Sequence, residues 1–188
     1  MPPKQKITSE MLLSHAFQIA REQGISAVTS RSVAKSVGCS IQPVFSHFPT
    51  MEALRKATFV YASETCMAEI LKHQDEPDFM LRTNIWLLEL ARSDSNLFEL
   101  LYLSGNFSSP NLWDTMMEWE SNQKMIELFS QTYQLTAAET KDIFMRSFFM
   151  LFGIATMIAT DKIDISNDEA LDMVKRTVAQ LVGGKGNG

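Results

Sequence analysis

The stretch from residue 29 to residue 50 constrains the fold of this chain most, because it reads as two short helices around a glycine. Thr29 can cap the first helix by accepting a hydrogen bond from an amide of the first turn. Gly38 follows where a helix often ends in a left-handed residue. Ser40 can cap a second helix, which Pro49 ends. Two short helices joined by a short turn with glycine predict a helix-turn-helix.

The rest of the chain also shows helical patterns. Apolar residues recur with a period near 3.6 residues, and no strand pattern stands out. Thr136 and Glu139 have the spacing of a capping box, as do Ser166 and Glu169. We therefore expect an all-α protein of about nine helices.

The charge is divided unevenly along the chain. Residues 1–56 hold seven of the 17 basic residues and three of the 22 acidic ones, a formal charge of +4. The remaining residues carry −9, and the whole chain −5. A basic module on an acidic body is typical of proteins whose nucleic-acid contact is confined to one end, although clustering on a solvated surface gives the same pattern.

Other features exclude several classes of protein. Cys39 and Cys66 are far apart and have no metal-ligand spacing, so we expect neither a metal nor a disulfide, and a reducing cytoplasm fits. The N-terminus lacks the apolar core of a signal peptide. The uncharged run over residues 147–160 is shorter than the roughly 18 residues that a membrane span needs. No phosphate-binding loop or nucleophile motif is present, so we expect no cofactor and no enzyme activity.

The N-terminal segment, roughly residues 7–56, resembles the TetR family of bacterial transcriptional regulators. The resemblance is carried as a set by Met11, Leu12, Ala16, Phe17, Gly24, Thr29, Val33, Ala34, Val37, Gly38, Ser40, Val44, Phe45, His47, Phe48 and Leu54. It implies a three-helix DNA-binding domain in residues 1–56, with the motif at about 29–49, and a helical effector-binding and dimerisation domain in residues 57–188. It also implies a homodimer on a palindromic operator, released when a small-molecule effector binds.

Two positions depart from the commonest family pattern. Phe45 stands where the family usually has Tyr, and Met51 where Lys is usual. Each departure removes an expected phosphate contact. The Thr50 hydroxyl and helix-end amides remain able to bind phosphate there.

Most of the residues expected to contact DNA lie on or beside the second helix of the motif. Gln42 lies early in that helix, where its amide can pair with a base edge, although a solvated surface Gln is the plain alternative. His47 is either a phosphate contact or a half-buried structural histidine. The full expected set is Thr29, Ser30, Arg31, Ser40, Ile41, Gln42, Pro43, Phe45, Ser46, His47 and Thr50.

Aromatic and Met side chains of the larger domain are candidates for a hydrophobic effector pocket, although each alone reads equally as helix-bundle core. They are Trp86, Phe98, Tyr102, Phe107, Trp113, Met116, Met117 and Trp119. The uncharged helix and the last helix predict a four-helix dimer interface, because a helix apolar nearly all round needs cover on every side. Its expected residues are Phe149, Phe152, Gly153, Thr156, Ala159, Leu171, Val174, Val178 and Leu181.

These observations favour a ligand-responsive, dimeric DNA-binding regulator, most simply a repressor. The alternative is a helical small-molecule-binding protein or enzyme in which the N-terminal helices are structural. A nonspecific architectural DNA binder fits less well, because most of the chain is acidic.

Overall fold

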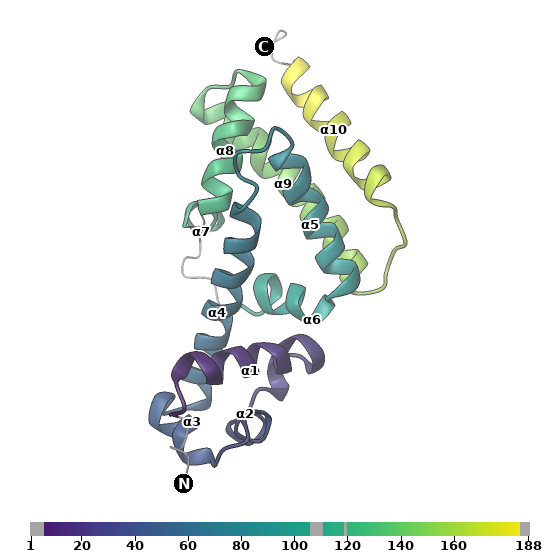
Figure 1. Cartoon of the computed structure of the whole chain (residues 1–188). Helices are drawn as coiled ribbons and strands as arrows, with labels where there is room; N and C mark the ends of the chain where they lie inside the picture. The colour runs from purple at the N-terminus through teal and green to yellow at the C-terminus, as the bar shows by residue number, and fades with distance from the viewer. Residues whose placement is uncertain (1–5, 106–110, 119, 185–188) are drawn as a thin grey trace. The chain divides into compact units, whose positions relative to one another are not determined.

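The computed structural model of the chain describes residues 6–105, 111–118 and 120–184 (Figure 1). Within these residues all regular structure is helical, with ten α-helices, one 3₁₀ turn (η1, Ile25–Ala27) and one π-helical turn (η2, Glu99–Leu103). The all-α prediction is confirmed. The chain forms two compact units, one of Met1–Cys66 with Asn96–Asn106, the other of Met67–Ser95 with Phe107–Gly188.

The first unit begins with α1 (Ser9–Gln23), α2 (Ser30–Val37) and α3 (Ile41–His47). The sequence also predicts Thr8 as a cap, and its hydroxyl accepts from the Met11 amide at 3.2 Å and starts α1, whereas the predicted Ser40 cap does not form. Apolar faces of the three helices meet in a small core, in which the most deeply buried side chains are Leu12, Ala16, Ala20, Val28, Val33 and Val44.

Helix α4 (Met51–Leu71) runs from the first unit into the second. The predicted border between residues 56 and 57 lies inside this helix, whereas the first compact unit continues along it to Cys66. Its residues Leu54, Thr58 and Ala62 are almost completely buried, at the spacing of one helix face.

The first unit also takes in a segment from the middle of the chain, α6 (Ser95–Phe98) with η2. Phe98, Leu100 and Leu101 are buried there. The Asn96 side chain donates to the Arg21 carbonyl at 2.8 Å, which satisfies a backbone acceptor at the end of α1. Burial raises the pKa of the Tyr102 phenol, and the nearby Cys66 raises it further.

The second unit is a helical bundle of α5 (Phe79–Ser93), α7 (Leu112–Met117), α8 (Glu120–Tyr133), α9 (Ala137–Ala159) and α10 (Asn167–Gly183). Helix α9 packs against α5, α8 and α10. Helices α7 and α8 follow each other closely, and the Asn122 side chain donates back to the Met116 carbonyl at 3.1 Å. The Thr136–Glu139 capping box forms as predicted, and Ser166 caps α10 by accepting from the Glu169 amide.

Helix α9 alone among the described helices is long and apolar enough to cross a membrane, by length and composition. The core helix of a soluble protein passes the same test. Its residues Phe144, Leu151 and Ala155 are buried against neighbouring helices, so packing within the bundle accounts for part of this composition.

Candidate nucleic-acid interface and bundle cavities

The turn between α2 and α3 presents one face of α3 to solvent. Gly38 has φ 79° and ψ 32°, the left-handed conformation that closes α2, and the Cys39 amide then donates to the Ala34 carbonyl at 2.9 Å. Val44 is 1% exposed and holds α3 to the core, whereas Ile41 is 47% exposed. The outward face of α3 is therefore free to meet a partner.

That outward face carries Gln42 between two apolar side chains. Gln42 is exposed, Phe45 is 44% exposed, and Pro43 is half-buried. The Ser46 hydroxyl donates to the Gln42 carbonyl at 3.0 Å, so it is partly engaged within its own helix. The carboxamide of Gln42 is left as the main polar group that this face offers to a base edge.

The start of α2 is tightly organised. The Thr29 hydroxyl accepts from the Ser32 amide at 3.0 Å, and the Ser32 hydroxyl accepts from the Thr29 amide at 2.9 Å, a reciprocal capping box. The Ser30 amide donates to the Met51 sulfur at 3.3 Å. Met51 therefore occupies one amide that could otherwise bind phosphate, and no local sequence pattern predicts this contact. Arg31 remains exposed beside it.

Two more of the expected contacts, His47 and Thr50, have partners within the chain, and Ser40 does not form its expected cap. The His47 Nε2 atom lies 3.2 Å from the Ile7 carbonyl, so Nε2 is the donor, but His47 is exposed and not half-buried as the structural alternative had it. The Thr50 hydroxyl accepts from the Ala53 amide at 3.0 Å and caps α4, which still leaves its proton to donate. Ser40 is exposed, and its side chain makes no cap hydrogen bond to α3.

The aromatic and Met side chains expected to form one effector pocket are spread over the described structure. Phe98 and Tyr102 pack on each other in the first unit, with ring centroids 5.3 Å apart. Trp113 lies 5.3 Å from the Lys141 ammonium, and Met116 is buried while Met117 is half-buried. Trp86 lines a cavity. Phe107 and the side chain of Trp119 lie outside the described residues.

One cavity of about 150 Å³ lies inside the second unit, between α5, α8, α9 and α10. Its wall is mainly apolar and aromatic, and includes Met80, Phe129, Tyr133, Phe144, Phe148 and Leu151. The rings of Phe129 and Phe144 meet edge to face at 5.6 Å. None of the residues expected to bind an effector lines this cavity, although Leu171, Val174 and Val178, expected at a dimer interface, do.

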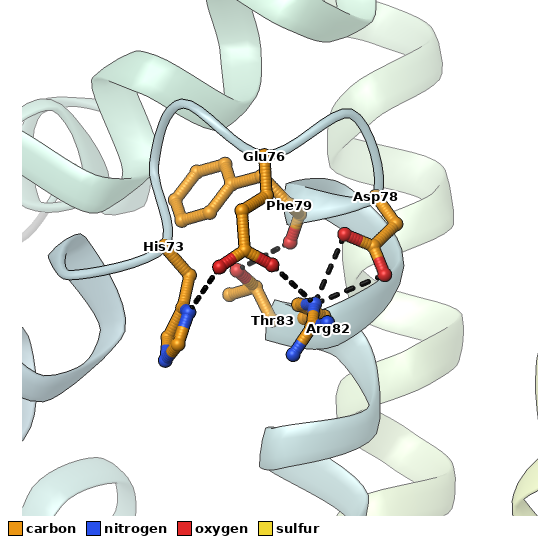
Figure 2. A network of polar contacts seen from close by, with 6 residues as sticks. All are labelled: His73, Glu76, Asp78, Phe79, Arg82 and Thr83. Atoms are coloured by element: carbon orange, nitrogen blue, oxygen red, sulfur yellow. Dashed lines mark hydrogen bonds and ion pairs between the residues drawn. The ribbon is translucent and has the colours of Figure 1, made fainter.

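A second cavity, of about 210 Å³, lies at the turn between α4 and α5, and Trp86 forms part of its wall. Charged groups at this turn are paired with one another (Figure 2). The Glu76 carboxylate lies 2.5 Å from His73 Nδ1 and 2.9 Å from Arg82 Nε. Arg82 Nε also lies 2.9 Å from the Asp78 carboxylate. Both carboxylates raise the pKa of Arg82, with Asp78 the larger influence. These ion pairs hold the turn between α4 and α5 in place. Because the charged side chains are paired with one another, few of them are available to a ligand in the cavity.

The expected dimer residues fall into two groups. Leu171, Val174 and Val178 are buried within their own chain. Phe149 is 54% exposed, Gly153 is exposed, and the rest are half-buried: Phe152, Thr156, Ala159 and Leu181. Met157 on α9 and Met173 on α10 are exposed as well, at 44% and 42%. The two helices thus retain large exposed apolar side chains.

Comparison with known protein families identifies a match in the first unit. Residues 12–58 match the family profile described as bacterial regulatory proteins, tetR family. A search of curated protein sequences finds no match.

Solved structures are similar over nearly the whole chain. The multidrug binding protein EbrR complexed with ethidium has a TM-score of 0.62 at 18% identity, over 94% of this chain and 99% of that one. The same protein with imidazole has a TM-score of 0.58 at 19% identity, over 92% and 96%. A TetR-like transcriptional regulator from Rhodococcus sp. RHA1 has a TM-score of 0.63 at 14% identity, over 97% and 100%.

A helix-turn-helix with an exposed second helix, followed by a helical bundle, defines the class of DNA-binding transcription regulators. Within that class, residues 12–58 match the TetR family profile, and over the rest of the chain the likeness to a TetR-like regulator is one of fold.

Proposed function

We propose that this protein is a dimeric repressor that binds a palindromic operator through α3 and releases it when a small hydrophobic effector enters the second unit. The observation that carries the first part is the exposed Gln42 on the outward face of α3, within the segment that matches the family profile. A single copy offers few hydrogen bonds, so specificity requires two copies at a fixed spacing. For two recognition helices in successive major grooves that spacing is about 34–36 Å.

Selection of genomic fragments, followed by fluorescence anisotropy on the selected site, tests DNA binding. Gln42→Ala should weaken binding to the selected site and leave binding to random DNA unchanged, because it removes a base contact and no charge. Gln18→Ala, an equally exposed Gln on α1, is the matched control and should have no effect. If no preferred site emerges from the selection, the proposal is wrong.

Phosphate contacts are distinguished from base contacts by a second pair of variants. Arg31→Glu should weaken binding to all sequences and reduce the salt dependence of the affinity. Arg146→Glu, on the second unit and paired there with Asp142, reverses the same charge and should change neither. Equal effects from the two variants would show that only net charge matters.

Dimerisation through α9 and α10 is supported by their exposed apolar side chains, because such residues rarely remain in water together without a partner. Phe149→Glu should lower the dimer fraction in sedimentation experiments. Val60→Glu, an exposed apolar residue of α4, serves as the control for an added charge. A wild-type chain that sediments as a monomer at micromolar concentration would contradict this part of the proposal.

Control by ligand is supported by the cavities inside the second unit and by the structural likeness to a ligand-bound protein. An effector must bind the DNA-free form more tightly than the DNA-bound form, because only differential affinity shifts the equilibrium. A ligand identified by thermal shift should therefore raise the dissociation constant of the selected operator. The proposed place of action is the cytoplasm, where the DNA and reduced thiols are found.

A further inference from the structure

We propose that the cavity between α5, α8, α9 and α10 is the effector site, and that it takes a small amphipathic anion: one aromatic ring inside, and a carboxylate at the mouth beside Lys175. This inference rests on the proposed ligand control only for the effect on DNA. The binding site itself stands on the geometry of the second unit. It also distinguishes this protein from a receptor for large lipophilic cations.

The volume sets the size of the ligand. A cavity of about 150 Å³ lined by apolar side chains is large enough for a single benzene ring. Pockets for drug-sized molecules are about 300–1,000 Å³. A polycyclic molecule such as ethidium therefore exceeds the space available here, whereas one ring on a short chain fits.

The wall determines what the body of the ligand must be. Phe129, Phe144 and Phe148 come from facing helices, and Leu151 and Val174 fill the spaces between them. Phe129 also packs on Tyr133, with centroids 4.9 Å apart. Aromatic walls of this kind favour a ring in stacked or edge-to-face contact. The ligand body is therefore apolar and preferably aromatic.

The charges at the cavity determine the head group. Lys175 is the one charged side chain among the described residues that line the wall, and none of those residues is Asp or Glu. No ion pair holds Lys175 within the described part of the chain. Two carboxylates close to the lining positions pair with basic residues of their own helix, Asp142 with Arg146 at 2.9 Å and Asp172 with Arg176 at 2.7 Å.

The remaining polar groups fit the same head group. The Asn84 carboxamide faces the cavity from α5 and makes no hydrogen bond to the described residues. The Ser147 hydroxyl donates its proton to the Phe144 carbonyl, at 2.8 Å. An N–H donor from Asn84 and an ammonium from Lys175 suit a carboxylate oxygen. A ligand ammonium would meet Lys175 with no carboxylate in the wall to offset the repulsion.

A series of three ligands with one body tests the charge. Isothermal calorimetry of the full-length protein without DNA should rank phenylpropionate above phenylpropionamide, and both above phenylpropylamine. The anion should bind roughly 3- to 10-fold more tightly than the amide, the range for a charge-assisted contact at an exposed lysine. An absence of anion binding up to its solubility limit, or equal affinity for the three ligands, would overturn the proposal.

Variants locate the site. Lys175→Gln should abolish the preference for the anion over the amide, and Lys175→Glu should place the amine first. Arg176→Gln, the neighbouring cation that does not line the cavity, should leave the order unchanged. Val174→Phe should fill the cavity and abolish binding of all three, and circular dichroism checks that it folds. If Val174→Phe does not fold, the Lys175 variants alone test whether the ligands bind in this cavity.

The outcome for the site is separate from the outcome for regulation. Anion binding in the expected order, without a change in operator affinity, supports the site and refutes the proposed ligand control. If the wild-type protein, with Lys175 present, does not bind the three ligands in the expected order of affinity, the proposed site is refuted. The proposal that α3 binds DNA is not affected by that result. Ethidium should not compete with phenylpropionate, and competition by ethidium would count against the size limit.

Discussion

Removal of the Ser32 hydroxyl should destabilise α2 more than removal of the Thr29 hydroxyl, although Thr29 is the residue that caps the helix. The Thr29 hydroxyl accepts one hydrogen bond, from the Ser32 amide at 3.0 Å. The Ser32 hydroxyl accepts from the Thr29 amide at 2.9 Å and donates to the Ala27 carbonyl at 2.7 Å, with the Thr29 carbonyl a second acceptor at 3.0 Å. Ser32 thereby ties the preceding 3₁₀ turn to the helix.

The magnitudes follow from the number of backbone groups left without a partner. Thr29→Ala leaves one amide, which costs about 1 kcal/mol, the usual cost of a lost N-cap. Ser32→Ala leaves an amide and a carbonyl, at about 1 kcal/mol each, or about 2 kcal/mol together. For a domain of this size each kcal/mol lowers the melting temperature by roughly 2–4 °C.

Thermal denaturation by circular dichroism measures the global effect, and amide hydrogen exchange shows whether the loss is confined to α2. Thr29→Ser keeps the cap hydroxyl and should remain near the wild type. Ser30→Ala, in the same turn, has no side-chain hydrogen bond to the described residues and corrects for the helix propensity that Ala gains. If Thr29→Ala proves as damaging as Ser32→Ala, the reasoning from the capping geometry fails.

Burial raises the pKa of the Tyr102 phenol above its ordinary value near 10, so the folded state keeps the proton that the unfolded state releases. Its contribution to stability should be complete below about pH 10 and fall above it, and Tyr102→Phe should flatten the alkaline side of the denaturation curve. Phe45→Tyr, at an exposed position of α3, should tighten binding to any DNA by roughly 2- to 10-fold, because it adds a hydroxyl for a phosphate oxygen. Arg55 donates to the Val28 and Ser26 carbonyls at 3.3 Å each, so Arg55→Met should lower the unfolding free energy by about 1 kcal/mol in urea titrations.

The local features of the DNA-binding segment could be predicted because each depends on a few neighbouring residues. The Thr8 and Thr29 caps, the left-handed Gly38 and the inward face of α3 all formed as the pattern predicts. Helix ends are set by side chain-to-backbone hydrogen bonds that span three or four residues, so a short sequence is enough to specify them.

Contacts between side chains distant in sequence escaped the same reasoning. Met51 was recognised as a lost cation, but the hydrogen bond between its sulfur and the Ser30 amide depends on where α4 passes α2. Similarly, Asn96 satisfies a carbonyl of α1 from a position 75 residues downstream. Neither residue has a local pattern that reveals its partner.

The candidate effector site shows the limit of composition as a guide. Aromatic and Met side chains predict a pocket around residues 86–119, whereas the apolar cavity is lined from α5, α8, α9 and α10 by other residues, such as Phe129, Phe144 and Leu151, whose pattern is that of ordinary core. Leu171, Val174 and Val178 were expected between two chains and are buried within one. An apolar helix face indicates only that something covers it, and the periodicity is the same for a partner, a ligand or the chain's own core.

By itself, the sequence determined the all-helical class, the helix-turn-helix and the side of α3 that faces outward, since helical periodicity, caps and glycine conformation are local properties of the chain. Only the tertiary structure decided which helices enclose a cavity and which charges remain unpaired at its mouth. Lys175 illustrates the difference. In the sequence it is one lysine on an amphipathic helix, and packing of four helices makes it the charged group of a cavity wall. The volume left between packed side chains and the pairing of charges arise from the assembled bundle, so no local pattern encodes them.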